Sequence, residues 1–96
     1  MKLTTIVIHE KDNVATCLAE MGAGDRADFA IGGEVKQLSV LEPIPFGHKI
    51  AVQPLETGDR VIKYGEVIGV ASRPIKAGQR VHIHNVESIR ARGDKA

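Results

Sequence analysis

Short runs of apolar or alternating residues, separated by Gly and Pro, predict that this chain is built mainly of β-strands. The predicted strands are residues 6–8, 27–31, 34–41, 49–53, 60–63, 67–71 and 80–84. All ten glycines and all four prolines follow position 21, and most of them lie between these runs. Since Gly and Pro favour turns, the pattern indicates a sheet with tight connections.

One segment near the N-terminus follows a helical period instead. Its apolar positions recur on one helical face, at Val14, Cys17, Leu18 and Met21. Asp12 or Asn13 is a suitable N-cap, and Gly22 is typical of the residue that ends a helix. We therefore expect a short helix from about Asp12 to Met21, with Cys17 as a small core residue.

A repeated motif connects several of the predicted strands. It reads Pro, aliphatic, two variable residues, Gly, polar, basic and β-branched, beginning at Pro43, Pro54 and Pro74, with residues 21–27 as a degraded fourth copy. Pro ends the preceding strand, and Gly adopts a backbone conformation that is costly for other residues. The uneven spacing of the copies argues against a solenoid and favours a compact sheet with repeated corners.

Length and composition suit a single domain, residues 1–96, whose last residues, about 89–96, are expected to be a flexible tail. The chain has 43% apolar residues but only two Phe, one Tyr and no Trp. Its core must therefore be built from aliphatic residues, and it is too small to enclose a large substrate.

Charge and cysteine content limit the expected partners and the expected cellular location. The formal net charge is +1, without a basic stripe that carries aromatic residues, so nucleic acid is not an expected partner. One cysteine permits no internal disulfide, which is consistent with a reducing compartment. Neither a signal-peptide core nor a membrane span is recognisable, so we expect a cytoplasmic protein.

Three of the four histidines lie at or just after the repeated corners. In the predicted strand 80–84, His82 and His84 would share one face with Cβ atoms about 6.5 to 7 Å apart. Two imidazoles at this spacing can share a divalent metal, for which His48 or Glu66 would be a third ligand. The alternative is an exposed strand face that carries two polar aromatic side chains.

Two lysines are candidates for binding a carboxylate or polarising a carbonyl, although lysines are usually solvated. Lys49 follows His48 directly, and Lys63 begins the turn Lys63–Tyr64–Gly65–Glu66. For Tyr64 a packing role is at least as plausible as a chemical one.

Three segments, residues 47–51, 61–69 and 81–86, resemble the N-terminal domain of altronate dehydratases. The N-terminal domain of galactarate dehydratases and the small subunit of sulfolactate sulfo-lyases are similar. The likeness runs from about residue 6 to residue 88 and keeps the family order of the motifs. It implies a SAF domain, with a mainly β, compact β-clip fold to which we add the one short N-terminal helix.

The resemblance implies a hydro-lyase that removes water, or sulfite, from a hydroxylated acid with help from a divalent metal such as Fe²⁺, Mn²⁺ or Zn²⁺. The chain lacks the large catalytic part of that family, so we expect the small subunit or accessory domain of a sugar-acid dehydratase. Its partners would be a large catalytic subunit and a sugar acid, and it would have no activity alone. A homo-oligomer is a further option.

By motif position, the resemblance also assigns the candidate site residues. His48 and Lys49 are expected to be catalytic, Lys63 and Asn85 to contact substrate, and His82, His84 and His48 to bind metal. The competing hypothesis is a non-catalytic SAF-type binding or assembly module, and the histidine pair beside Asn85 favours the dehydratase.

Overall fold

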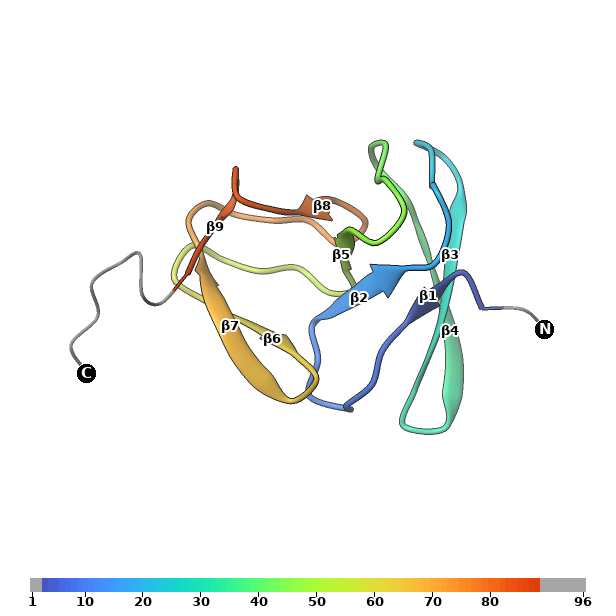
Figure 1. Ribbon diagram of the computed structural model, residues 1–96, viewed down its shortest axis with the longest axis horizontal. Helices are drawn as coiled ribbons and strands as arrows, with labels where there is room; N and C mark the ends of the chain where they lie inside the picture. The colour runs from blue at the N-terminus through green and yellow to red at the C-terminus, as the bar shows by residue number, and fades with distance from the viewer. Residues whose placement is uncertain (1–2, 89–96) are drawn as a thin grey trace.

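The computed structural model describes residues 3–88, which form nine short β-strands and, within that range, no helix (Figure 1). The strands are β1 (Thr5–Ile6), β2 (Val14–Cys17), β3 (Arg26–Ile31), β4 (Glu34–Ser39), β5 (Lys49–Ala51), β6 (Arg60–Lys63), β7 (Glu66–Ala71), β8 (Arg80–Val81) and β9 (Val86–Glu87). The prediction of a mainly β chain is confirmed. The predicted tail, about residues 89–96, lies outside the described residues.

The predicted helix from Asp12 to Met21 is wrong, because β2 occupies the middle of this segment. Val14 and Ala15 are both 1% exposed although they point to opposite faces of the strand. A strand covered on both faces has no polar alternation, so its apolar residues imitated a helical period by coincidence. Leu18, which a helix would bury, is 47% exposed.

Antiparallel pairing produces one central sheet and two flanking ones. The central sheet has the order β1-β2-β5-β8, and the others are the hairpin β3–β4 and the sheet β6-β7-β9. In Figure 1 the two hairpins lie on opposite sides of the central strands. Each side of the central sheet therefore faces a different flanking sheet.

Two hydrophobic cores correspond to the two sides of the central sheet. The first contains Val14, Ala51, Leu55, Val61, Ala71, Ile75 and Val81. The second contains Ala15, Cys17, Met21, Ala27, Val40, Ile44 and Ile50. The register pairs Val14 with Ala51 and Ala15 with Ile50, so neighbouring residues of one strand supply different cores.

The repeated motif forms four corners with the same geometry, including the degraded copy. Isolated bridges join the corners in two pairs, Met21 to Ile44 and Leu55 to Ile75. The corner glycines all have positive φ, between 84° and 96° (Gly24, Gly47, Gly58 and Gly78). Each turn is closed by a bond from the residue after the glycine to the carbonyl three residues earlier, which is the pattern of a type II turn.

Each corner is also tied to a neighbouring segment by a reciprocal pair of backbone hydrogen bonds. The Gly47 N–H donates to the Cys17 carbonyl at 2.8 Å, and the Cys17 N–H donates to the His48 carbonyl at 2.8 Å. The partners of the other three corners are Val40, Ala71 and Ala51. The sequence predicted the corners, but not this pairing.

The buried carboxylate of Asp12 holds the β6–β7 hairpin in place through backbone hydrogen bonds. Tyr64, at the tip, has φ 57°, which is uncommon for a residue other than Gly. The Gly65 N–H donates to Asp12 at 2.8 Å, and the Ile8 and His9 N–H groups donate to the same carboxylate. Asp12 thus fixes the position of Lys63 and Tyr64.

Among the residues described, no helix could span a bilayer.

Candidate functional site

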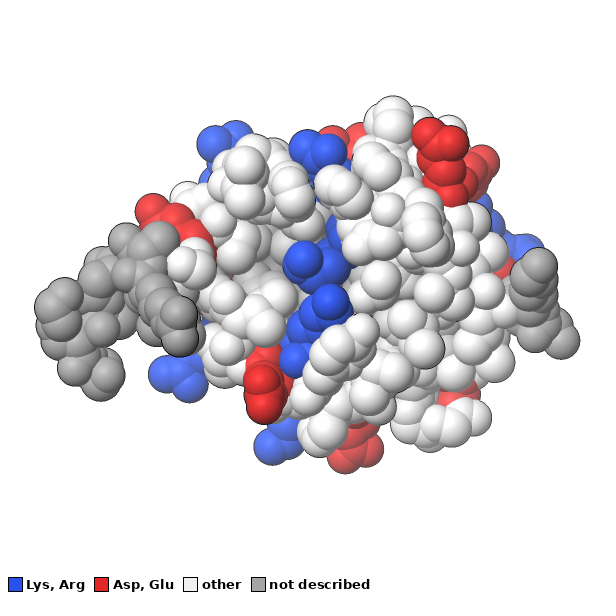
Figure 2. Space-filling model, in the orientation of Figure 1, with Lys and Arg blue, Asp and Glu red and all other residues white. Residues whose placement is uncertain are grey.

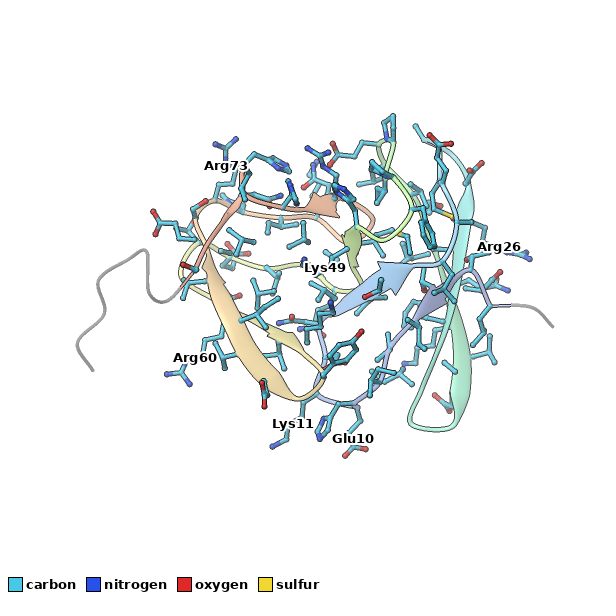
Figure 3. The ribbon with its side chains drawn as sticks, in the orientation of Figure 1. Glu10, Lys11, Arg26, Lys49, Arg60 and Arg73 are labelled. Atoms are coloured by element: carbon cyan, nitrogen blue, oxygen red, sulfur yellow. The ribbon has the colours of Figure 1, made fainter. Side chains whose placement is uncertain are left out.

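Two imidazoles meet where the β5 and β8 strands run side by side. His48 ends the corner before β5, and His82 follows β8 directly. Their ring centroids are 4.7 Å apart and their planes are inclined by 34°. Lys49, the first residue of β5, pairs in register with Val81 and lies near the middle of the molecule in Figure 3. The structure therefore brings together three of the predicted site residues.

The predicted strand 80–84 ends early, and this changes how His82 is held. β8 stops at Val81, and residues 82–85 form a turn. His82 and His84 are consequently not neighbours on one strand face, so that expectation is wrong. The reason lies in Asn85, whose side chain captures two backbone groups that a longer strand would need.

Asn85 is only 3% exposed, and its amide closes the turn. Its Oδ1 accepts a hydrogen bond from the His82 N–H at 2.9 Å, and its Nδ2 donates to the Arg80 carbonyl at 2.8 Å. Asn13 makes the equivalent pair of bonds to Ile62 and Arg60 after the Leu55 corner. Asn85 therefore shapes the loop that presents His82 and offers little surface to a ligand.

His48 differs from the residues at the same position in the other corners. In those three, the side chain after the glycine accepts a bond from a backbone N–H three residues earlier. The pairs are Gly22 to Asp25 at 2.7 Å, Glu56 to Asp59 at 2.8 Å and Lys76 to Gln79 at 2.8 Å.

In the His48 corner the corresponding donor position is Pro45, which has no N–H. The imidazole is therefore not needed to hold its own turn. Within residues 3–88, the buried Nδ1 of His48 has no hydrogen-bond partner. Buried polar atoms are normally satisfied, so this nitrogen is an available group beside His82. Comparing the third position of the four motifs, the first of the two variable residues, would have shown this from sequence.

A cavity of about 230 Å³ lies beside the imidazole pair. Its walls are mostly aliphatic, and its lining is Lys49, Ile68, Val81, His82, Ile83, Val86 and Ser88. Lys49 enters it from the central sheet, on the side that faces β6 and β7. The cavity therefore joins an apolar wall to an amine and an imidazole, as small-ligand sites usually do.

Of the two lysines predicted to bind a carboxylate, Lys63 acts on Lys49 through its charge. Burial, followed by the positive charge of Lys63, lowers the pKa of Lys49. The Lys63 Nζ lies 4.7 Å from the centre of the Tyr64 ring. Figure 2 shows Lys and Arg side chains gathered in a column down the middle of this face, where Figure 3 places Lys49.

Positive neighbours also surround His82. Partial burial and then the charges of His48, Arg80, Lys49 and His84 lower its pKa from the ordinary 6.5. At neutral pH His82 is therefore a neutral imidazole, which can accept a proton. Every charged group that acts on it is basic, and sequence reasoning had not included Arg80.

For a metal, the chain offers fewer ligands than we expected. Nowhere in residues 3–88 do three His, Cys, Asp or Glu side chains lie close enough together to hold an ion. His48 and His82 form a pair, while His84 is exposed on the adjacent turn. A metal at this site stays a prediction.

Comparison with known proteins identifies close sequence relatives. Residues 3–89 match the family described as "Altronate/galactarate dehydratase SAF domain". The chain is 38% identical over 84 residues to the altronate dehydratase of Bacillus subtilis, covering 86% of this chain but 16% of that protein. It is 38% identical over 73 residues to the L-threo-forming galactarate dehydratase of Escherichia coli, covering 76% of this chain and 13% of that enzyme.

A separate small subunit is also similar. The (2R)-sulfolactate sulfo-lyase subunit alpha of Paracoccus pantotrophus is 39% identical over 66 residues, covering 69% of this chain and 88% of the subunit. The chain thus spans about a sixth of the dehydratases it matches and most of this subunit. The resemblance inferred from the three sequence motifs is confirmed.

Proposed function

This chain belongs to the altronate/galactarate dehydratase SAF domain family, and we propose that it is the small subunit or accessory domain of a sugar-acid dehydratase. In this role it holds the acidic substrate and contributes proton-transfer groups, while a large catalytic chain supplies the rest of the active site. The family relatives are dehydratases and lyases, and one of them is a small subunit of comparable size.

The observation that carries the proposal is a cluster of basic groups around the cavity. Lys49 and His82 line it, and His48 and Lys63 act on them directly. The Arg26–Asp28 ion pair lies on β3, and none of the side chains that line the cavity is a carboxylate. An acidic ligand would neutralise the cluster, with the aliphatic walls increasing the strength of the attraction.

The arrangement suggests a role for each residue. The Lys49 and Lys63 ammonium groups attract the substrate carboxylate and stabilise the charge that grows on it when the α-proton leaves. His48, which its own turn does not use, takes or returns a proton beside the neutral His82. Asn85 positions His82 through the backbone.

A divalent metal such as Fe²⁺, Mn²⁺ or Zn²⁺ fits this scheme only with outside ligands. His48 and His82 would supply two nitrogen ligands, fewer than protein metal sites normally use, so the large chain would complete the set. Such an ion would polarise the carboxylate or the leaving hydroxyl when bound.

The rim of the site suits contact with the large chain. Phe46 is 69% exposed two residues before His48, and Ile83 is 84% exposed next to His82. Both segments lie along the upper edge of the molecule in Figure 1. Exposed apolar side chains beside a polar site are typical of a protein interface.

The first test is turnover of altronate and galactarate by this chain with and without a large catalytic dehydratase chain. We expect no turnover by this chain alone and turnover by the pair. Lys49→Ala should lower kcat/KM of the pair about tenfold or more, because it removes a charged contact to the carboxylate. The control Lys36→Ala alters an exposed lysine on β4 and should have no effect. Turnover by this chain alone, or an unaffected Lys49→Ala pair, would contradict the proposal.

The second test concerns the rim. Phe46→Asp and Ile83→Asp should weaken association with the large chain in sedimentation or calorimetry, since each places a charge in an apolar contact. Val35→Asp is the matched control, because Val35 is 52% exposed on the separate β3–β4 hairpin. Association that none of these substitutions changes, together with self-association of this chain, would support an assembly module instead.

A further inference from the structure

We infer that Tyr64 is a positioning residue, whose ring holds the Lys63 ammonium group near Lys49 so that both positive charges act on the substrate carboxylate. This role rests on the proposed function, to which it adds a residue that keeps two like charges together. Two features of Tyr64 carry it, namely its strained backbone and the contact that its ring makes.

Tyr64 occupies a loop position that ordinarily takes a different residue. Lys63 and Glu66 pair in register, so Tyr64 and Gly65 form a two-residue hairpin loop between β6 and β7. The φ angles of the two loop residues are 57° and 77°. Positive φ at both positions is characteristic of a type I′ turn, which strongly favours Asn-Gly or Gly-Gly. A bulky aromatic residue at the first position is costly.

The β3–β4 hairpin shows that the loop itself does not need a tyrosine. It makes the same kind of two-residue loop with Gly32 and Gly33, whose φ angles are 60° and 83°. In the β6–β7 loop only the second position is restricted to glycine by its surroundings, because a Cβ at Gly65 would lie 2.9 Å from the His9 ring. Backbone strain that the turn does not require is typical of a functional position. We therefore expect the Tyr64 ring to have a role of its own.

That ring contacts a charge and not the core. Tyr64 is 51% exposed, so burial does not account for it. The Lys63 Nζ lies 4.7 Å from the ring centre, within the range of a cation–π interaction. Glu66 is the register partner of Lys63, yet among residues 3–88 the two side chains form no ion pair. The aromatic face thus holds the ammonium group in place of the neighbouring carboxylate.

The difference between these two ways of holding Lys63 matters for a ligand. A carboxylate partner would cancel the positive charge, whereas a neutral ring fixes its position and leaves it available to an anion. Lys63 does not line the cavity, but its charge acts on Lys49, which does. Two ammonium groups repel each other, and the long lysine stem would otherwise carry Lys63 toward water.

Two substitutions separate the ring from the turn. Tyr64→Asn removes the ring and supplies the residue that the loop favours, so the urea midpoint of unfolding should stay the same or rise. Tyr64→Phe keeps the aromatic face. We would measure the ring-current shift of the Lys63 ε-methylene protons by NMR in this chain, and kcat/KM for altronate in the pair with a large catalytic chain. Tyr64→Asn should abolish the shift and lower kcat/KM roughly three- to fivefold, and Tyr64→Phe should retain both.

A further variant tests whether Tyr64 acts through Lys63. Lys63→Ala should lower kcat/KM at least as much as Tyr64→Asn, and combining the two should have no additional effect. Gly32→Asn is the matched control, because it places the same residue at the equivalent loop position of the β3–β4 hairpin, where a Cβ would meet nothing within 4 Å. It should change neither the Lys63 signal nor turnover.

The outcomes distinguish this role from the proposed function. An unshifted Lys63 signal in the wild type, or a Tyr64→Asn pair as active as the wild-type pair, would overturn the role of Tyr64 and leave the proposed function standing. Effects of Tyr64→Asn and Lys63→Ala that add in full would do the same, since they would show a tyrosine that acts independently of Lys63. No turnover by the wild-type pair would overturn both.

Discussion

At the scale of single residues, Pro45 has no N–H group for the His48 side chain to accept a hydrogen bond from, so this imidazole does not hold its own turn. Asp25, Asp59 and Gln79 each use their side chain to hold the corner in which they stand. Pro45 removes the donor from the fourth corner, and its fixed φ stiffens that turn in place of the missing bond. His48 is thereby free to face His82.

This account predicts a specific energetic coupling between positions 45 and 48. Pro45→Lys with His48→Gln recreates the Lys76–Gln79 bond, so the double variant should be about 1 kcal/mol more stable than the sum of the single changes. Urea unfolding of all four proteins gives the coupling free energy. The cycle cancels the entropy that any loss of Pro45 adds to the unfolded chain. A coupling near zero would mean that the imidazole is not released by Pro45.

The resemblance pointed to His48, Lys49, Lys63 and His82 as candidate site residues, and the structure brings His48, Lys49 and His82 together. The sequence did not indicate what holds these side chains in place. The turn at residues 82–85 was missed because Asn85 was interpreted as a substrate contact. An asparagine one turn after a short strand competes with the strand for backbone partners, and that competition depends on burial. The sequence pattern alone does not show whether the strand continues or the asparagine side chain takes its backbone partners.

At the scale of elements, the β6–β7 hairpin owes its position to Asp12. Burial raises the pKa of this carboxyl, but hydrogen bonds from Gly65, His9, Tyr64 and Ile8 outweigh it and lower the pKa below 3.8. A lowered folded-state pKa stabilises the protein above the unfolded value, and this contribution is lost as the pH falls through the folded value.

Asp12→Asn should therefore destabilise the chain by roughly 2 kcal/mol at pH 7, since an amide accepts these bonds more weakly than a carboxylate. The difference from wild type should shrink below about pH 4, as the wild-type carboxyl becomes protonated. Thermal unfolding across this range measures both. Glu10→Gln, at an exposed position beside the same loop, is the control. A difference that does not depend on pH would contradict the role of the charge.

The corners offer a second comparison at this scale. Gly58 and Gly78 have nearly the same φ, 94° and 96°. A Cβ at Gly78 would overlap the Ser39 carbonyl oxygen, whereas one at Gly58 would meet nothing within 4 Å. Gly58→Ala should cost about 1 kcal/mol from backbone strain, and Gly78→Ala clearly more. Equal losses in chemical denaturation would show that the close packing under Gly78 is unimportant.

Elements were predictable to different degrees for a physical reason. β3 and β4 are bounded by turn residues, and their expected ranges agree with the structure to within two residues. β2 has core on both faces, so Val14, Ala15 and Cys17 resemble a helix as closely as a strand. Tertiary burial, which is not a local property, decided the outcome.

At the scale of the whole molecule, the placement of the charged residues indicates more about the candidate site than their number does. The chain is close to neutral, with 13 basic and 12 acidic residues. Figure 2 nevertheless shows several Lys and Arg side chains gathered in a column down the middle of one face. Two of the motifs bring basic residues together, because Lys49 and Arg80 begin β5 and β8 and these strands lie side by side. Net charge therefore gave no indication of this site.

The two cores on either side of the central sheet affect how cooperatively the chain unfolds. Val14 and Ala15 are adjacent, yet each belongs to a different core. Neither half can release its side of β2 without disturbing the other, so cooperativity should extend across all nine strands. Val14→Ala, costing roughly 2 kcal/mol, should lower the amide-exchange protection of the β3–β4 hairpin as much as that of β6–β7. Protection lost only in β6–β7 would reveal two foldons rather than one.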